Sequence, residues 1–241
     1  MISAETILEE QQQFFEELRY NKNRFRDFLH TMVHHYRQPV RRQVQIFFHA
    51  PKNSSAYASA EIWQRLGATV AEGATGVPVL GADGVSVTRI YDISETQDAA
   101  RQGIQSLVWR YDAQQDSDTV DALFQSDPGD TMEQRIFSAC KRKATEDCMT
   151  SPELASLGAA YVVLARLGMD ADAIVGLPLI LAKYDDVPAE TLLDDISRTA
   201  ISVLDPVAKI VRKREREAQR LDDTRRTPEA SRTPEGFSDD G

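Results

Sequence analysis

The segment from Leu154 to Leu167 constrains the fold more than any other part of the chain. It is almost wholly apolar apart from Tyr161 and Arg166, so a helix built from it has no polar face to turn toward water. The residues before it, Ser151-Pro152-Glu153, supply a cap, a first-turn proline and a carboxylate near the positive helix end. Gly168 is expected to end the helix. The pattern predicts a buried central helix, and therefore a C-terminal half made of helices.

Amphipathic helical patterns also account for most of the remaining sequence. Apolar residues recur at helical spacing from Ala4 to Tyr20, and again from Asn21 to just before Pro39. A third helix should begin at Pro39, with its apolar face inward. We expect three polar residues of that helix to point outward, namely Arg41, Arg42 and Gln45. Three more helices are predicted: Ala58 to Leu66, ended by Gly67, one through Ile136 and Phe137, and Thr191 to Leu221, bent at Pro206.

One stretch indicates β structure. Glycines break any helix between Gly73 and Gly84, and the valines of this region alternate with other residues as in strands. Ala82-Asp83-Gly84 is typical of a β-hairpin turn. Between Gln97 and Gln125 the composition becomes polar, and no element is predicted there. The fold class is therefore α+β, mainly helical, with a small antiparallel β-hairpin or sheet in the N-terminal half and a helical C-terminal subdomain.

These elements suggest a division into three segments. Residues 1–97 hold the N-terminal helices and the hairpin, and residues 98–221 form the helical C-terminal subdomain. Residues 222–241 contain a single phenylalanine among proline, charged and small polar residues, which is too little apolar surface to fold. We interpret this last segment as a disordered tail or a linker.

Composition excludes several classes of protein. The 241 residues carry a net charge of -10, with 41% hydrophobic and 27% charged residues, which is ordinary for a soluble globular protein. No stretch approaches the roughly 18 apolar residues of a membrane span, and the first residues lack the layout of a secretion signal. A cytoplasmic location is expected. Cys140 and Cys148 are too few and too far apart for a zinc site or a disulfide framework, so both should be reduced.

Motifs for catalysis or metal binding are not evident. His30 and His34 have the spacing of two zinc ligands on one helix, but the glutamate of a metalloprotease helix is missing and no third ligand is evident. Asp194 and Asp195 form an acidic pair without a nucleophile nearby, and solvated carboxylates are the commoner interpretation. No nucleophile elbow and no phosphate-loop fingerprint occurs. We predict no metal, no cofactor and no enzymatic activity.

The charge of the chain reverses between Tyr20 and Arg65, a segment called the basic window below. It holds eight basic and two acidic residues, a net +6, which leaves -16 for the rest of the chain. Aromatic residues alternate with the basic ones, a mixture that can neutralise phosphates and stack bases. The alternative is an amphipathic helical pair whose aromatic residues are core and whose arginines are a solvated face. The same alternative applies to Trp63, which stands beside Ile62 and Leu66.

Several short motifs follow one another along the chain in a recognisable order. They are Gln43–Pro51 (QVQIFFHAP), Glu61-Ile62-Trp63, the spaced Gly67, Gly73 and Gly76, Ile90–Gln97 (IYDISETQ), Ala159–Asp172 (AAYVVLARLGMDAD) and Asp195-Ile196-Ser197. This order resembles the ArdC-type antirestriction N-terminal domain, which is also found at the start of the LtrC-like polyvalent proteins of conjugative elements and phages. The resemblance covers most of residues 10 to 215.

The resemblance implies single-stranded DNA binding by a noncatalytic accessory module, which travels with a mobile genetic element and helps it survive restriction. A single-strand binder needs a basic groove for phosphates and flat side chains for bases, and the basic window supplies both. The predicted partners are single-stranded DNA and other mobile-element or host restriction proteins, with no membrane. The candidate residues are Arg37, Arg41, Arg42 and Lys52 for the backbone, Tyr57 and Trp63 for stacking, and Arg65 and Arg89 as flanking charge.

A competing hypothesis starts from the acidic remainder of the chain. A strongly negative surface repels a polyanion at long range, and it can instead occupy the basic cleft of a DNA-binding enzyme. The chain is then a protein-interaction or scaffolding module, which imitates DNA or belongs to a larger DNA-transfer protein.

Overall fold

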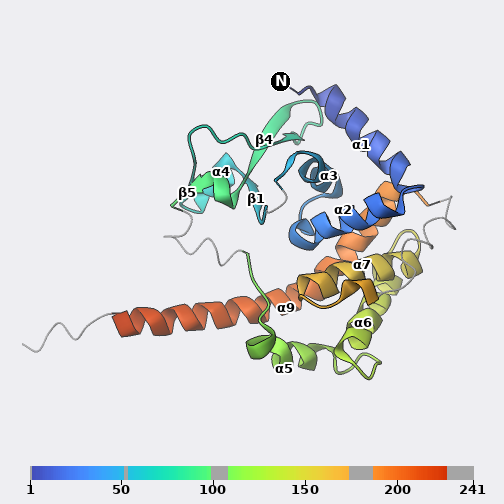
Figure 1. The fold of residues 1–241 in the computed structure, drawn as a ribbon, viewed down its shortest axis with the longest axis vertical. Coiled ribbons are helices and arrows are strands. Elements are labelled where there is room, and N and C mark those ends of the chain that lie inside the picture. Colours follow the sequence, from blue (N-terminus) through green and yellow to red (C-terminus); the bar gives the residue numbers. More distant parts are fainter. Residues whose placement is uncertain (1, 52–53, 99–107, 174–186, 227–241) are drawn as a thin grey trace, which may run out of the picture.

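The computed structural model describes residues 2–51, 54–98, 108–173 and 187–226. Figure 1 shows three N-terminal helices beside two small sheets, with the C-terminal helices below them in that view. The last helix extends well beyond the rest of the molecule. The predicted fold class is confirmed, since the fold is α+β, mainly helical, with its antiparallel strands in the N-terminal half.

The N-terminal helices form where the sequence predicts them. They are α1 (Ala4–Leu18), α2 (Lys22–His35) and α3 (Val40–His49). Side chains cap two of them, because Ser3 and Asn21 each accept a hydrogen bond from a backbone N–H in the first turn of α1 and α2. The apolar faces of all three helices turn toward a shared core.

The side chains of α3 correct one expectation. Arg41 is exposed and Arg42 is half-buried, but Gln45 is fully buried, so the prediction that it points outward is wrong. The reason is that α3 contacts α1, α2, the sheet and the last helix at once, which leaves only a narrow strip of its surface for solvent. Gln43 is also fully buried, and its amide nitrogen donates to the backbone oxygen of Gln38 at 2.7 Å.

Two small antiparallel sheets follow α3. The first has the strand order β1-β4-β3, and the second pairs β2 with β5. The predicted hairpin is confirmed, because β3 and β4 pair antiparallel on either side of the Ala82-Asp83-Gly84 turn, where Gly84 has a φ of +71°. The elements of this region are β1 (Tyr57–Ser59), α4 (Ala60–Arg65), β2 (Thr69–Val70), β3 (Val77–Leu80), β4 (Val87–Asp92), the 3-10 turn η1 (Ile93–Glu95) and β5 (Thr96–Gln97).

The C-terminal half is helical, and its helices cross one another around α7. One of them, α5, lies in the polar stretch for which no element was predicted; a single buried stripe of Asp116, Val120 and Phe124 anchors it. The described elements are α5 (Ala113–Phe124), α6 (Met132–Asp147), α7 (Pro152–Arg166), the 3-10 turn η3 (Ala171–Ala173) and α9 (Ala189–Arg226).

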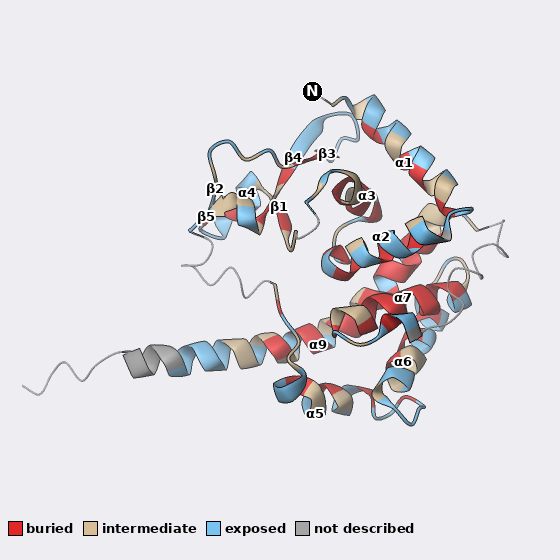
Figure 2. Cartoon of the chain, viewed as in Figure 1, coloured by how far each residue is buried: buried red, intermediate tan, exposed pale blue. Residues whose placement is uncertain are grey.

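The central position of α7 is confirmed. Every residue from Leu154 to Leu164 is buried, and α7 contacts α2, α6 and α9 (Figure 2). Gly158 permits the approach of α9, because a Cβ atom at this position would lie 2.4 Å from the side chain of Ile196. The largest core joins α1, α2 and α3 to the C-terminal helices. The boundary predicted at residue 97 therefore does not coincide with a break in the hydrophobic core.

A buried carboxylate also links α9 to the start of α7. Asp195 is fully buried, and its Oδ2 accepts hydrogen bonds from the backbone N–H groups of Met149 and Thr150 and from the hydroxyl of Thr150. Its other oxygen, Oδ1, lies 3.1 Å from Arg198. The interpretation of Asp195 as a solvated carboxylate is wrong, whereas its neighbour Asp194 is exposed.

The two ends of the C-terminal segment depart from the predicted boundaries. Helix α9 begins at Ala189 and continues to Arg226, five residues beyond the predicted limit. The predicted tail from residue 227 onward lies outside the described residues. Within the described part of the chain, no helix combines the length and the apolar character needed to span a membrane.

Candidate nucleic-acid interface

The basic window is held against the acidic C-terminal half. Three of its arginines form ion pairs with distant carboxylates, each with a nitrogen–oxygen distance of 2.5 Å. They are Arg26 with Asp172, Arg37 with Asp205 and Arg41 with Glu190. Carboxylates of the C-terminal half therefore neutralise part of the positive charge of the basic window within the molecule. These side chains are 33 to 59% exposed, so each pair contributes little stability.

The other predicted cations are spread over several elements. Arg42 donates to the side-chain oxygen of Gln38 at 3.3 Å. Arg65 is exposed and lies 3.9 Å from Glu61, one helical turn away on α4. Lys52 lies outside the described residues. Arg37 and Arg41 line two different hollows, and neither Arg42 nor Arg65 lines either of them.

Arg89 has a local partner. Its guanidinium donates to the backbone oxygens of Thr75 and Gly76, in the loop that precedes β3. In the same loop, the carboxylate of Glu95 accepts from the backbone N–H groups of Thr75 and Gly76 at 3.1 and 3.0 Å. Arg89 therefore holds this loop against the hairpin. Its guanidinium is engaged by backbone carbonyl oxygens of the protein itself.

The two aromatic residues predicted to stack on bases are buried. Trp63 is 1% exposed, and its indole nitrogen donates to the backbone oxygen of Tyr91 at 2.9 Å. Tyr57 is 5% exposed, and burial raises the pKa of its hydroxyl to about 12. Stacking requires an accessible ring face, and neither ring has one. This corrects the prediction: both rings pack beneath the small sheets, as the alternative for Trp63 proposed.

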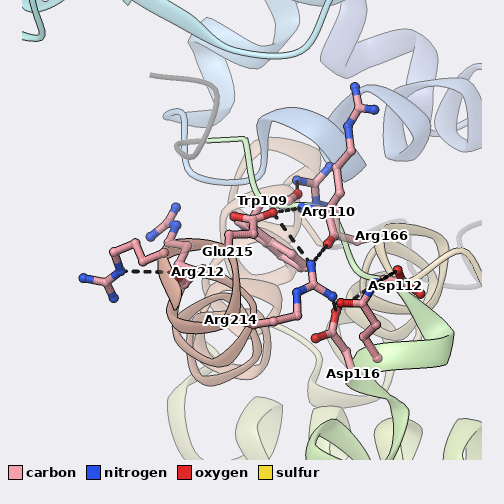
Figure 3. Close-up of polar contacts among 10 residues, drawn as sticks. Trp109, Arg110, Asp112, Asp116, Arg166, Arg212, Arg214 and Glu215 are labelled. Carbon is pink, nitrogen blue, oxygen red and sulfur yellow. Dashed lines mark hydrogen bonds and ion pairs between the residues drawn. The ribbon is translucent and has the colours of Figure 1, made fainter. Parts of the chain in front are cut away.

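A pocket of about 240 Å³ collects guanidinium groups that the sequence places far apart. It lies between the end of α2, the region of β1 and α4, and the helices α7 and α9. Three predicted candidates line it, the cation Arg37 and the buried rings of Tyr57 and Trp63. Arg166 from α7 and Arg212 from α9 line it as well. The indole of Trp109 forms part of its wall. Figure 3 shows how Arg166, Arg212 and the residues around Trp109 lie relative to one another.

Two larger hollows do not concentrate charge of one sign. A groove of about 870 Å³ between α1 and the start of α9 is lined by Arg19 and Arg41, but also by Glu16 and Glu190. A second hollow of about 560 Å³ runs beside α2 and α3 and contains three histidines and Asp27. The smaller pocket is therefore the better candidate for an anionic ligand.

Arg166 is the central residue of this pocket, which we call the arginine pocket. Its guanidinium carbon lies 4.5 Å from the centre of the Trp109 ring, and its Nη2 donates to the backbone oxygen of Trp109 at 2.7 Å. Its Nε is buried and has no hydrogen-bond partner among the described residues. No carboxylate of the described chain lies within ion-pair distance of it. A cation on an aromatic ring is stabilised by the ring quadrupole, but that contact leaves the positive charge in place.

Like charges face one another across the arginine pocket. Burial lowers the pKa of Arg166, and the positive charges of Arg110, Arg212 and Arg37 lower it further. Burial and the charge of Arg37 likewise lower the pKa of Arg212. The charges of Asp205 and Glu215 act against this lowering at Arg212. Perturbed pKa values of this kind occur at functional sites and also in structural ion-pair networks.

The histidines beside the pocket are neutral partners. Burial lowers the pKa of His34, with the charge of Arg166 as the second cause, so its Nδ1 can accept from Arg166 at 3.3 Å. Burial lowers the pKa of His35 to about 4. At neutral pH these residues add no positive charge, and the electrostatic character of the pocket comes from the arginines.

Two further charged residues of α9, Arg214 and Glu215, form contacts outside the arginine pocket. Arg214 forms an ion pair with the buried Asp116 at 2.5 Å, and its Nη2 donates to the backbone oxygen of Arg110 (Figure 3). Glu215 accepts from the backbone N–H of Arg110 at 3.4 Å. These contacts fix the segment around Trp109 on α9, so they hold one wall of the pocket in position.

Comparison of the chain with protein-family models, with curated proteins and with solved structures gave no match. Among the described residues, no group of three or more histidine, cysteine, aspartate or glutamate side chains is placed to hold a metal ion. The chemistry of the arginine pocket is therefore the basis of the functional argument.

Sequence reasoning found one of the three arginines of the pocket and missed the other two. Arg166 had a detectable signal, because it is a charged residue at the end of a run predicted to be buried. Arg212 belongs to a run of basic residues in the last helix. Charge pairing along the helix and exposure to solvent are sufficient to explain such a run, so it did not indicate a pocket. Trp109 lies in a stretch without any predicted element, and no pattern there indicated that it would meet Arg166.

Proposed function

We propose that this chain is a noncatalytic single-stranded-DNA-binding accessory module of a mobile genetic element, with a role in antirestriction. The observation that carries the proposal is the convergence of Arg37, Arg166 and Arg212 on one pocket. The acidic surface of the rest of the chain limits binding to such a local site, because its long-range field repels a polyanion.

A phosphate group fits the chemistry of the arginine pocket. The planar guanidinium forms paired hydrogen bonds with phosphate oxygens, and it does so most favourably where water is excluded. Burial is the main cause of the lowered pKa values of Arg166 and Arg212, and neighbouring positive charges add to it. An anion between the two guanidinium groups would offset both effects. The pocket is concave and small, which favours a single strand over the rigid and wider duplex. Guanidinium planes can also stack on bases, so the buried aromatic residues are not required for base contact.

The order of motifs along the sequence supports the biological context. Its resemblance to the ArdC-type N-terminal domain extends over the β-hairpin and over the helix that carries Arg166. The helix that carries Arg166 belongs to the largest core, whereas the hairpin packs in a smaller one with Ile46 of α3. The arginine pocket is lined by Arg166 and by Ile62 and Trp63 of the second motif. In this proposal the two halves act together on the strand, and restriction proteins of the host or proteins of the mobile element are further partners.

The first experiment measures binding of a labelled single-stranded oligonucleotide by fluorescence anisotropy, at low and moderate salt, with a duplex of the same sequence alongside. Tighter, salt-sensitive binding of the single strand is expected. The variant Arg212→Gln should reduce the slope of log affinity against log salt by about 0.7, the contribution of one phosphate contact. Arg166→Lys keeps the charge but loses the planar fork, so it should weaken binding severalfold at every salt concentration.

The control variant is Lys141→Gln. Lys141 is exposed on α6, outside the lining of the arginine pocket, so its removal changes the net charge equally without touching the pocket. Affinity losses of the same size in Lys141→Gln and Arg212→Gln would contradict a specific site. No binding of the single strand by the unmodified protein at low salt would overturn the proposal and favour the protein-interaction alternative.

A further inference from the structure

Helix α9 carries a second group of cations beyond the arginine pocket. From Lys209 onward the basic residues recur with spacings of three, one, three and four, at Lys209, Arg212, Lys213, Arg216 and Arg220. Successive helical residues are rotated by about 100°, so these five side chains fall within an arc of about 100° on one face. We call this face the basic stripe. It runs along the part of α9 that extends beyond the body of the molecule (Figure 1).

The other charged residues of the same helical segment serve a different purpose. Arg214 and Glu215 turn back to the body, where Arg214 pairs with Asp116 and Glu215 accepts from the backbone of Arg110. In contrast, Lys209, Lys213, Arg216 and Arg220 are exposed. The helix thus separates its charges into a face that anchors it and a face that meets solvent. Solubility alone would not require the basic residues to be gathered on one face of the helix.

The exposed part of α9 is not built to pack against another helix. From residue 212 to residue 221 its only apolar residues are Ala218 and Leu221. A coiled-coil partner requires apolar residues repeated every three or four positions, and that repeat is missing here. Between residues 209 and 220 the acidic residues are Glu215, which faces the body, and Glu217, which lies 3.9 Å from Lys213. The basic residues of this segment outnumber them, so the chemistry of the basic stripe complements a polyanion.

Arg212 connects the basic stripe to the arginine pocket, because it belongs to both. We propose that the basic stripe carries the phosphodiester backbone of the single strand as it leaves the arginine pocket. This inference rests on the proposed function and names the rest of its binding surface. From Lys209 to Arg220 the helix rises by about 16 Å. That length accommodates on the order of three to five further nucleotides at the phosphate spacing of one strand.

The test compares two single-stranded oligonucleotides, of about four and about sixteen nucleotides, which bracket the site sizes of known single-strand binders. The variant is Lys213→Gln/Arg216→Gln, in which both residues are exposed and glutamine preserves helix propensity. The matched control, Arg19→Gln/Lys141→Gln, removes the same charge from exposed positions just after α1 and on α6. Circular dichroism spectra and melting temperatures confirm that all the proteins are folded.

The stripe variant should bind the long oligonucleotide about tenfold more weakly at moderate salt, with a salt slope reduced by about 1.4, or about 0.7 for each lost contact. Its affinity for the short oligonucleotide should equal that of the unmodified protein, since the arginine pocket is intact. The control should show neither effect.

Three results would overturn the inference. An unchanged affinity of the stripe variant for the long oligonucleotide, with binding still sensitive to Arg212→Gln, refutes the basic stripe but leaves the proposed function standing. An equal loss for both lengths shows a general charge effect. A glutamate peptide of about sixteen residues that competes as well as the long oligonucleotide points to an acidic protein partner. Failure of the unmodified protein to bind either oligonucleotide refutes the proposed function itself.

Discussion

Single side chains near the arginine pocket show how the fold tolerates a partly buried charge. Arg166 has no carboxylate partner among the described residues, and its contacts are the ring and backbone oxygen of Trp109 and the Nδ1 of His34. A cation on an aromatic ring contributes about 0.5–2 kcal/mol, which offsets only part of the cost of removing the guanidinium from water. The proposed anion site would account for this cost, because perturbed charges of this kind occur at many functional sites.

His35 makes stability depend on pH. Its folded pKa of about 4, lowered mainly by burial, lies below the ordinary value of about 6.5. The unfolded chain therefore binds the proton first as the pH falls, and stability that is fully present above pH 6.5 is lost between pH 6.5 and 4. Between pH 7.5 and 5 the loss from this residue should be about 2 kcal/mol.

The variant His35→Gln should remove that part of the pH dependence, because glutamine does not titrate. Urea unfolding of both proteins at pH 7.5 and pH 5 measures it. His34, with its pKa also lowered, contributes in the same direction to both proteins and cancels in the comparison. An identical loss of stability in the two proteins would contradict the burial of a neutral imidazole at residue 35.

At the scale of elements, the contact between α7 and α9 organises the C-terminal half. Gly158 allows the two helices to approach, and Asp195 satisfies the backbone N–H groups just before α7 begins. The apolar run of α7 could be predicted from the sequence because a helix without a polar face has to be buried. The partner of that run could not be predicted, because any apolar helix face supplies similar burial energy, and the close fit at Gly158 depends on distant residues.

Asp195→Ala should destabilise the protein by about 2 kcal/mol, because it leaves the partly buried donors of Met149 and Thr150 without their acceptor. Asp194→Ala is the matched control. Asp194 is the adjacent exposed carboxylate, and its loss should change stability by no more than about 0.5 kcal/mol. Chemical denaturation of the three proteins provides the measurement. Equal effects of the two substitutions would refute the role assigned to Asp195.

At the scale of the whole molecule, charge is segregated along the sequence and matched across the fold. The basic window meets Asp172, Glu190 and Asp205 of the acidic half. These pairs connect segments that are far apart in the chain, so they favour the docking of the two halves in one orientation. Their partial exposure means that salt screens them.

The triple variant Asp172→Asn/Glu190→Gln/Asp205→Asn should be less stable at low salt by about 1–2 kcal/mol in total. The difference should shrink as salt is added, because screening weakens the pairs in the unmodified protein. Unfolding free energies at low and high salt measure this effect. A stability difference that does not change with salt would show that these contacts are not electrostatic.

Most of the local structure could be predicted from the sequence, because helix caps, glycine positions and hydrophobic periodicity act over a few neighbouring residues. It predicted the three N-terminal helices, the β-hairpin and the buried α7. Only the tertiary structure decided that Trp63 and Gln45 are buried, that Arg41 pairs with Glu190, and that Arg166 and Arg212 share a pocket. These outcomes depend on which distant surfaces meet, and that choice is made by packing complementarity summed over the whole core.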